Sequence, residues 1–379
     1  MSEGMELYLH MPFCVRKCSY CDFLSFPSGA KTQRMYAKRL MEDIGVMGKR
    51  YGEIPVETIF IGGGTPSVPD SGLIVEIMEH VRHAFHVADG AEISMEANPG
   101  TVTREKLTDY RKAGINRLSF GLQSANDREL KLLGRIHTWA EFLESFTLAR
   151  ECGFANLNID LMSALPGQTC ESWKETLSRV TDLDPEHISA YSLIIEEGTP
   201  FGERYGSEEG RKLLPDEDSE REMYHETKRF LKDCGYERYE ISNYAKPGRE
   251  CRHNIGYWTG VPYLGLGLGA SSYLDGCRFT VNPDMKQYLE EKPGMFTDIE
   301  KLTKKDMEEE FFYVGLRMTA GVSLSEFERR FGISAKEVYP GLMETFVKEK
   351  AARFEGDRFV LTDYGLDVSN YIMAQFLQD

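Results

Sequence analysis

Short apolar runs and longer amphipathic runs alternate through the first half of the chain, and this alternation constrains the fold more than any other feature. The apolar runs have the composition and length of buried strands, and they cover residues 5–10, 56–61, 92–97, 116–122, 156–163 and 187–195. The stretches between them are too long for hairpins and show helical periodicity, so crossover helices must join the strands. The pattern predicts an α/β chain whose parallel sheet forms a partial, open (β/α)6 barrel, similar to a TIM barrel with fewer units.

Regular alternation stops after residue 197, which predicts three parts in the chain of 379 residues. Residues 1–200 form the barrel. Residues 201–300 extend and connect it, with an exposed connection at 198–216 and a packed, glycine-rich loop at 261–274. Residues 301–379 form a smaller helical domain. Its helices are expected at 304–318, 323–330, 334–348 and 365–377, with a hairpin at 353–361. Helices combined with such a hairpin resemble a winged helix.

Composition excludes several classes of protein. The net charge of −16 gives the chain no general basic face, which a nucleic-acid-binding protein needs. No stretch approaches 18 consecutive apolar residues, and the first residues lack the basic and apolar regions of a signal peptide. The cysteines beyond residue 21 are scattered without the spacing of a disulfide framework. These features predict a cytoplasmic protein.

Three cysteines, Cys14, Cys18 and Cys21, follow the first predicted strand with the spacing Cys-x3-Cys-x2-Cys. Three thiolates on one loop can hold three irons of a [4Fe–4S] cluster, whereas a closed cluster site has four cysteine ligands. The fourth iron then keeps an open position for substrate or cofactor chemistry. One alternative is a structural zinc site with His10 as the fourth ligand, although the chain has no second Cys-x2-Cys pair. The other alternative is a set of buried, inert thiols.

Polar or glycine-rich segments also follow the other predicted strands, at residues 62–66, 96–99, 121–123 and 158–160. Parallel α/β barrels place their chemistry at the C-terminal ends of the strands, so these segments are expected to meet at one face. Glycines at 62–64 let backbone amides approach a ligand, although a tight turn would explain them as well. Glu96 and Arg135 could instead be surface residues. Asp160, a buried carboxylate, needs either a structural partner or a ligand.

The cysteine loop resembles that of the radical S-adenosylmethionine (SAM) superfamily. In that family SAM chelates the open iron through its amino and carboxylate groups, and an electron from the cluster cleaves it to a 5′-deoxyadenosyl radical. Over essentially its whole length, the chain is similar to the group of oxygen-independent coproporphyrinogen III dehydrogenases and their relatives. The resemblance implies the same partial barrel, a [4Fe–4S] cluster on the three cysteines, and bound SAM.

The resemblance also implies roles for individual residues, although it assigns no separate catalytic residue. The glycine-rich turn would hold the SAM amino group, Arg135 would face the SAM carboxylate as a charge-assisted donor, and Asp160 would accept from the ribose hydroxyls. Tyr8 would lie near the cluster. The SAM-binding positions implied in this way are Tyr8, Gly63, Gly64, Thr65, Glu96, Gln123, Arg135 and Asp160.

Two departures distinguish the chain from the dehydrogenases of this group. The dehydrogenases carry a cysteine two residues after the third cluster cysteine, where this chain has Phe23. They also carry an N-terminal extension that covers the active site, whereas the cluster loop of this chain begins at residue 14. Both departures are similar to the shorter relatives in the group, which act as heme chaperones.

A second motif, His-Asn-x-x-Tyr-Trp at residues 253–258, is similar to one tied to heme binding in those chaperones. Histidine is a common axial ligand of heme iron, and aromatic side chains pack on a porphyrin. The resemblance therefore implies heme contacts by His253, Tyr257 and Trp258. The structural alternative is that both aromatic side chains belong to the core and His253 is hydrogen-bonded beneath them.

The sequence therefore predicts a radical SAM protein that binds heme and delivers it to heme-requiring respiratory enzymes, with a reductant protein for its cluster. It leaves open whether SAM is cleaved or only bound, and whether the chain forms a homodimer or makes peripheral contact with a membrane. One alternative is an oxygen-independent coproporphyrinogen III dehydrogenase, which removes propionate carboxyls as carbon dioxide. The other is a zinc-stabilised binding module.

Overall fold

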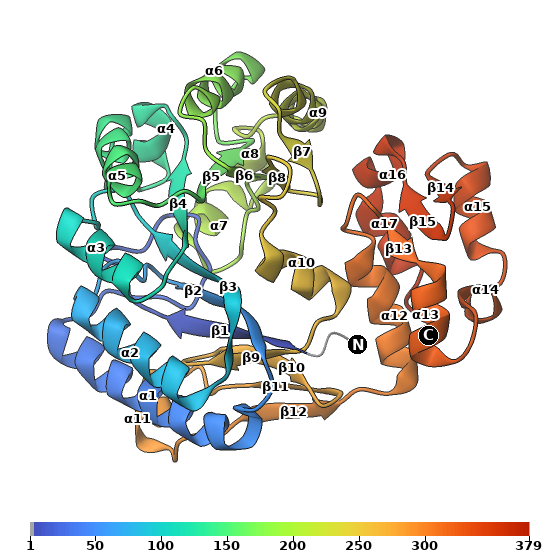
Figure 1. Cartoon of the computed structure of the whole chain (residues 1–379). Coiled ribbons are helices and arrows are strands. Elements are labelled where there is room, and N and C mark those ends of the chain that lie inside the picture. The colour runs from blue at the N-terminus through green and yellow to red at the C-terminus, as the bar shows by residue number, and fades with distance from the viewer. Residues whose placement is uncertain (1–3, 379) are drawn as a thin grey trace.

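The computed structural model describes residues 4–378, and within this range a twelve-stranded mixed sheet organises most of the chain. Six neighbouring strands form its centre in the order of the sequence (Figure 1): β1 (Met5–Met11), β2 (Val56–Gly63), β3 (Val87–Ala97), β4 (Arg117–Gln123), β5 (Leu157–Ser163) and β6 (His187–Ser192). Every pairing between these neighbours is parallel. The predicted open, parallel (β/α) barrel is therefore confirmed.

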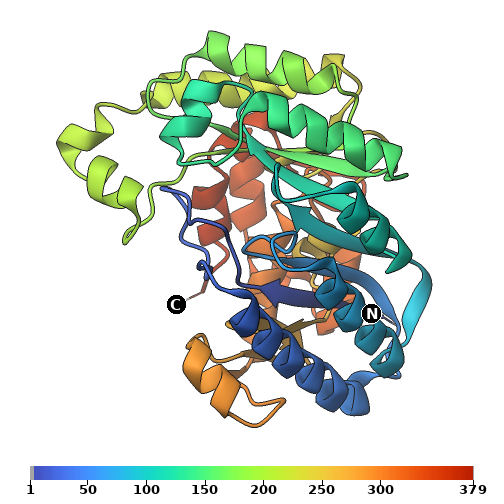
Figure 2. The same cartoon turned by 90° about the vertical axis from the view of Figure 1, so that its left-hand side faces the viewer.

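Helices connect the central strands and cover their outer face (Figures 1 and 2). They are α1 (Ala30–Tyr51), α2 (Ser71–Ala84), α3 (Arg104–Lys112), α4 (Asp127–Leu132), α5 (Trp139–Glu151) and α6 (Cys170–Thr181). Thr138 and Thr169 form capping boxes that satisfy the first amides of α5 and α6. The cap of α2 is Asp70, whose carboxylate accepts the amide of Gly72 at 2.9 Å. Between residues 4 and 378, no helix combines the length and apolar character needed to cross a membrane.

The sheet continues beyond β1 through a segment that the sequence predicts to be loop. β9 (Tyr263–Leu266) pairs in parallel with β1, and β10 (Ser271–Leu274), β11 (Cys277–Thr280) and β12 (Thr297–Lys301) follow as antiparallel strands. The prediction of a packed loop at 261–274 is therefore wrong. These strands are short and contain glycine, so pairing with the distant β1 determines their conformation more than local propensity does.

At the other edge, β8 (Asn243–Ala245) pairs antiparallel with β6, and β7 (Glu237–Arg238) pairs with β8. α9 (Glu217–Asp233) precedes these strands, and α10 (Arg252–Thr259) and α11 (Met285–Glu290) follow them. α10 packs against β1 and β2, where Gly256 lies directly against the carboxylate of Glu6. A side chain at Gly256 would collide with that carboxylate, so this close approach requires glycine.

The predicted exposed connection at 198–216 is partly wrong. It contains two short helices, α7 (Pro200–Tyr205) and α8 (Glu208–Arg211). Phe201 and Tyr205 are buried in an apolar cluster with Leu133, Met162 and Leu165. The segment is rich in charged residues, so its composition predicts an exposed loop although two of its aromatic side chains are buried.

The C-terminal part has its own buried apolar cluster, which extends from Phe312 to Phe376. Its elements are α12 (Lys304–Gly315), β13 (Val322–Ser323), α13 (Leu324–Phe331), α14 (Ala335–Val338), α15 (Leu342–Lys348), β14 (Ala352–Glu355), β15 (Arg358–Leu361), α16 (Asp363–Asp367) and α17 (Ser369–Ala374). The hairpin turns at Gly356, as expected, and β13 completes a three-stranded sheet. The helix expected at 334–348 is interrupted at Pro340 and Gly341, because proline removes a helical amide and Gly341 has a φ of +76°. The last expected helix is also divided in two.

Candidate functional site

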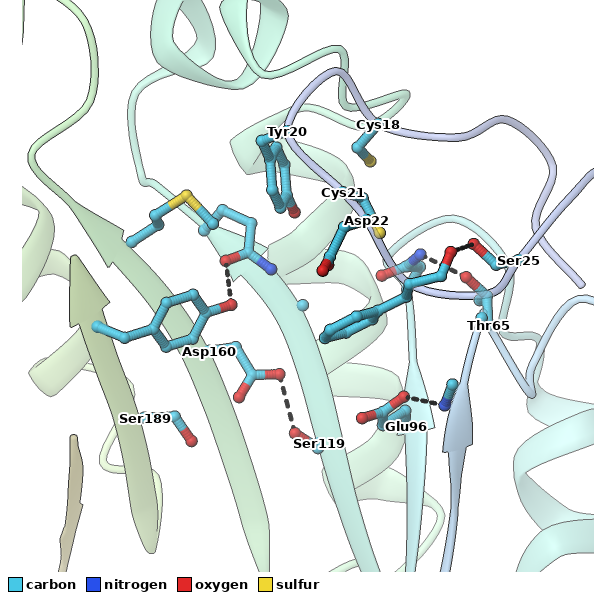
Figure 3. A pocket seen from close by; sticks show the side chains of 18 of the residues that line it. Cys18, Tyr20, Cys21, Asp22, Ser25, Thr65, Glu96, Ser119, Asp160 and Ser189 are labelled. Carbon is cyan, nitrogen blue, oxygen red and sulfur yellow. Dashed lines mark hydrogen bonds between the residues drawn. The ribbon is translucent and has the colours of Figure 1, made fainter. Parts of the chain in front are cut away.

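A cavity of about 460 Å³ opens among the central strands, and the cysteine loop borders it (Figure 3). All three cysteines of the loop line it. So do most of the other positions expected to bind SAM: Gly63, Gly64, Thr65, Glu96, Gln123 and Asp160. Tyr8 and Arg135 are not among the lining residues, although each contacts residues that are. The structure thus brings together side chains from five successive strand-to-helix units.

Main-chain hydrogen bonds and a buried aromatic ring hold the cysteine loop in place. The amide of Cys14 donates to the carbonyl of Phe26 at 3.1 Å, and the amide of Phe26 donates to Pro12 at 2.9 Å. Phe13 is fully buried, and its ring packs edge-on against Tyr36. The three thiols themselves are free and half-buried. The loop is therefore anchored mainly by its backbone, and its sulfur atoms make only long contacts, such as that of 3.6 Å between Cys14 Sγ and Thr65 Oγ1.

The loop fits an iron–sulfur cluster better than a single zinc ion. Within residues 4–378, no three His, Cys, Asp or Glu side chains converge in a way that could hold one metal ion. A cubic cluster has no such requirement, because each thiolate binds a different iron. His10 is also engaged elsewhere: its Nδ1 is hydrogen-bonded to the hydroxyl of Tyr8 at 3.0 Å and its Nε2 to the carbonyl of Leu24 at 2.9 Å. The geometry gives no support to a zinc site completed by His10.

The glycine-rich turn after β2 packs tightly against the cysteine loop. Gly64 and Thr65 donate their amides to the carbonyls of Met11 and Phe13, at 2.9 and 2.7 Å. A Cβ on Gly64 would lie 2.8 Å from backbone atoms of both residues, and Gly63 has a φ of +107°. The amides of the turn are thus committed to the protein, contrary to the expectation that they face a ligand. The glycines are needed because the two segments approach so closely.

Two carboxylates face the cavity from β3 and β5 (Figure 3). Glu96 accepts the amide of Gly63 at 3.0 Å, and burial together with the charge of Asp160 raises the pKa of Glu96 to about 8. Asp160 accepts from Ser119 Oγ at 3.0 Å and from Asn158 Nδ2 at 2.7 Å. Burial also raises the pKa of Asp160, although these hydrogen bonds oppose the shift. A cationic or hydroxyl-bearing ligand would stabilise the ionised form of either group.

Gln123 and Arg135 form hydrogen bonds that link residues around the cavity. Gln123 is buried with a φ of +75°, and its Oε1 accepts the hydroxyl of Tyr191 at 3.1 Å. Arg135 donates to Asn98 Oδ1 at 2.6 Å, to the carbonyl of Gly121, and to the sulfur of Cys18 at 3.5 Å. Its guanidinium therefore links the cysteine loop, through Cys18, to β4, through Gly121.

Tyr8 also lies next to a residue that lines the cavity. Its ring stacks on Phe60 with a centroid separation of 6.5 Å, and its hydroxyl is bonded to His10 as described above. Neither Tyr8 nor Arg135 reaches the cavity in this structure, so a direct contact between either residue and SAM stays a prediction.

Several lining residues were not singled out from the sequence, and they follow a simple rule. In β4, β5 and β6, alternate residues line the cavity: Arg117, Ser119, Gly121 and Gln123; Asn158, Asp160 and Met162; Ser189 and Tyr191. Ser192, at the end of β6, lines it as well. Side chains alternate between the two faces of a strand, so the polar ones among them mark the inner face. This two-residue period is visible in the sequence once the strands are assigned.

The motif at residues 253–258 forms most of α10, and its histidine lies in the core. His253 is 1% exposed, its Nδ1 is bonded to Thr58 Oγ1 at 2.6 Å, and its Nε2 is bonded to the hydroxyl of Tyr257 at 3.0 Å. The ring stacks on Phe60 at 5.3 Å, and burial lowers the pKa of His253 to about 3. Trp258 is half-buried beneath the guanidinium of Arg317. The hydrogen bonds of His253 agree with the structural alternative, whereas Tyr257 and Trp258 are half-buried and not core residues; heme contact by the motif stays a prediction.

Comparison with known proteins matches two family models to the chain. Residues 8–180 match the model of the radical SAM superfamily, and residues 302–368 match that of the HemN C-terminal domain. Among solved structures, coproporphyrinogen III oxidase (HemN) from Escherichia coli superposes with a TM-score of 0.85 and 23% sequence identity, covering 99% of this chain and 91% of that chain. At this identity the match shows the shared fold only.

Curated relatives share more of the sequence. The protein named heme chaperone HemW of Bacillus subtilis is 35% identical over 98% of both chains. Its namesake in Escherichia coli is 34% identical and covers 99% of this chain and 98% of the relative. A mitochondrial radical SAM domain-containing protein 1 of Danio rerio is 31% identical over 96% of this chain and 83% of its own length. The chain belongs to the radical SAM superfamily and, within it, to the HemW family.

Proposed function

We propose that this protein is a heme chaperone that carries a [4Fe–4S] cluster and SAM, binds heme, and passes the heme to heme-requiring respiratory enzymes. The observation that carries the proposal is the similarity of 34–35% identity, over nearly the full length, to curated relatives named heme chaperone HemW. Radical SAM membership implies the cluster and SAM, and the three free thiols beside a cavity that Glu96 and Asp160 line suit both.

In this proposal Cys14, Cys18 and Cys21 each bind one iron of the cluster. When bound, the cluster and SAM would supply one-electron radical chemistry, for which a reductant protein would provide the electron. Glu96 meets the SAM amino group, and Asp160 accepts from the ribose hydroxyls. Both carboxylates lie in the same cavity as the thiols, which supports these assignments.

The second candidate function is that of an oxygen-independent coproporphyrinogen III dehydrogenase. The dehydrogenases carry a cysteine at the position of Phe23, and here the phenyl ring lines the cavity while 60% of its surface is exposed. A phenyl ring cannot carry out thiol chemistry, but it can pack against a macrocycle. This observation favours heme binding over porphyrinogen oxidation.

A heme contact through His253, Tyr257 and Trp258 requires α10 to rearrange. Both ring nitrogens of His253 are hydrogen-bonded, so the ring can bind iron only after it leaves Thr58 or Tyr257. We retain the contact as part of the proposal, together with a cytoplasmic location, homodimer formation and peripheral membrane contact. Heme titration of His253→Ala tests it directly, because an axial ligand leaves a signature in the heme absorbance spectrum.

The function is tested with protein reconstituted without oxygen. Hemin is titrated in, and the loaded protein is then mixed with a heme-free respiratory enzyme whose activity reports transfer. We expect stoichiometric heme binding, recovery of the enzyme, and no decarboxylation of coproporphyrinogen III. Decarboxylation without heme transfer would instead establish the dehydrogenase.

A further inference from the structure

The cavity has a polar floor that the SAM assignments leave without a ligand. Four side chains contribute to it: Arg117 at the start of β4, Ser242 and Asn243 at β8, and Asn254 in α10. Asn254 is the second residue of the His-Asn-x-x-Tyr-Trp motif. The motif therefore reaches the cavity through its asparagine, while its histidine is directed into the core.

Arg117 is a buried cation with too few partners. It is 2% exposed, its only side-chain hydrogen bond in the described part of the chain runs from Nη1 to Ser94 Oγ at 3.4 Å, and its Nε has none. No carboxylate among residues 4–378 forms an ion pair with it. Burying a charge is costly unless the charge is paired, so this guanidinium has donors available for an anionic group.

The two nearby carboxylates do not fill this role. Glu92 accepts the amide of Arg252 at 3.1 Å, the amide of His253 at 3.3 Å and the thiol of Cys251 at 3.4 Å. The oxygens of Asp160 accept from Ser119 and Asn158, as described above. Both carboxylates are thus held by other donors, and Arg117 feels their charge only at a distance.

The other floor residues add hydrogen-bonding groups without partners. Within residues 4–378, the side chains of Asn254 and Ser242 make no hydrogen bond. The amide nitrogen of Asn243 donates to Glu240 at 2.6 Å, while its buried Oδ1 has no partner. The unpartnered oxygen of Asn243 is an acceptor and does not help to bind an anion. The donors on this floor are the Arg117 guanidinium, the Asn254 amide and the Ser242 hydroxyl, a set that can bind a carboxylate.

We propose that this floor binds a carboxylate of the porphyrin, with Arg117 pairing to one heme propionate. The inference rests on the heme binding proposed above and specifies which part of heme enters the cavity. The apolar macrocycle would lie toward the mouth, where Phe23 and Ile194 line the cavity and are 60% and 69% exposed. Heme combines an apolar face with two anionic arms, and the cavity combines an apolar rim with a cationic floor.

The test compares hemin with its dimethyl ester, in which both propionates are neutral. Each is titrated into the full-length, cluster-loaded protein in the presence of SAM, with absorbance as the readout. We expect the native protein to bind hemin about tenfold or more tightly than the ester, since a hydrogen bond to a charged group contributes that much. Arg117→Gln should bind the ester unchanged and hemin as weakly as the ester. Arg117→Lys should restore part of the preference.

Two further variants keep the result interpretable. Asn254→Ala should reduce the preference for hemin by a smaller factor, and it serves as the test if Arg117→Gln does not fold. Arg249→Gln removes one exposed positive charge outside this cavity and should leave the preference intact.

A preference for hemin that survives in both Arg117→Gln and Asn254→Ala would overturn the inference. The inference would also be overturned if Arg117→Gln lost SAM affinity, measured without porphyrin, by the same factor as hemin affinity. The carboxylate that Arg117 binds would then be that of SAM. If the native protein binds neither porphyrin, the proposed function itself fails. If it binds both equally, only the propionate site fails.

Discussion

The carboxylate of Glu6 lies 3.8 Å from Nδ1 of His253, yet the two side chains do not form a charged pair. Burial raises the pKa of Glu6 to about 9 and lowers the pKa of His253 to about 3, so both groups are neutral near pH 7. The two residues form a neutral, buried contact between β1 and α10. Its consequence is a stability that depends on pH.

Glu6→Gln should stabilise the protein at alkaline pH. The pKa of Glu6 is higher in the folded state than its ordinary value, so the unfolded chain releases the proton first and the free energy of unfolding falls as pH rises from about 4.5 to about 9. Glutamine is neutral throughout. We expect a gain on the order of 2 kcal/mol near pH 8 and little change near pH 4.5, measured by urea denaturation. The exposed Glu53→Gln is the control, and an equal gain in both variants would contradict the explanation.

Binding of SAM should strengthen as pH rises toward the pKa of Glu96. Without ligand, burial keeps much of this carboxyl protonated below about pH 8, whereas a hydrogen bond donated by the SAM amino group favours the carboxylate. We expect the dissociation constant to fall several-fold between about pH 6 and pH 8 in the native protein, and to be weaker and flat in Glu96→Gln. Equilibrium titration of the cluster-loaded protein measures both curves. Parallel curves for the two proteins would rule out this role of Glu96.

Asp160→Ala should weaken SAM binding by about tenfold, because a carboxylate that accepts ligand hydroxyls is removed while Ser119 and Asn158 keep each other as partners at 2.7 Å. The exposed Asp89→Ala should leave the dissociation constant unchanged. The same titration measures both variants, and an unchanged affinity in Asp160→Ala would remove it from the SAM site.

Gly64→Ala should displace the cysteine loop. The new methyl group would lie 2.8 Å from backbone atoms of Met11 and Phe13, which cannot move like a flexible side chain. We expect a loss of about 2 kcal/mol or more in the free energy of unfolding, and reduced iron uptake. Gly45→Ala is the matched control. Its Cβ meets nothing within 4 Å inside α1, so it should stabilise the protein by about 0.5–1 kcal/mol.

Reconstitution without oxygen should load about four irons per chain, and Cys14→Ala should lose most of them. Cys152→Ala changes a thiol at the far end of α5 and should retain the full iron content. Iron and zinc are counted together by elemental analysis. Zinc in place of iron would contradict the assignment of a cluster.

The sequence predicts the central barrel well because each strand there is a short segment rich in apolar residues, and the segments between the strands show helical periodicity. β9 could not be found in this way, since its four residues become a strand only by pairing with β1, more than 250 positions earlier. The strand-end residues predict where the cavity forms. The sequence does not point to Arg117, because this residue begins its strand and functional residues are expected at the C-terminal ends of the strands. Arg135 was noticed, but only the tertiary structure shows that its guanidinium turns toward Cys18.

The cysteine loop is ordered by its own hydrogen bonds and packing, so its shape does not depend on a bound cluster. Hydrogen bonds from Cys14, Thr65 and Phe26, together with the buried ring of Phe13, fix the loop through atoms that bind no iron. Little conformational entropy is then lost when a cluster enters, because the loop is already ordered. We therefore expect that a lost cluster can be reassembled from iron and sulfide on the folded loop, without unfolding and refolding of the chain.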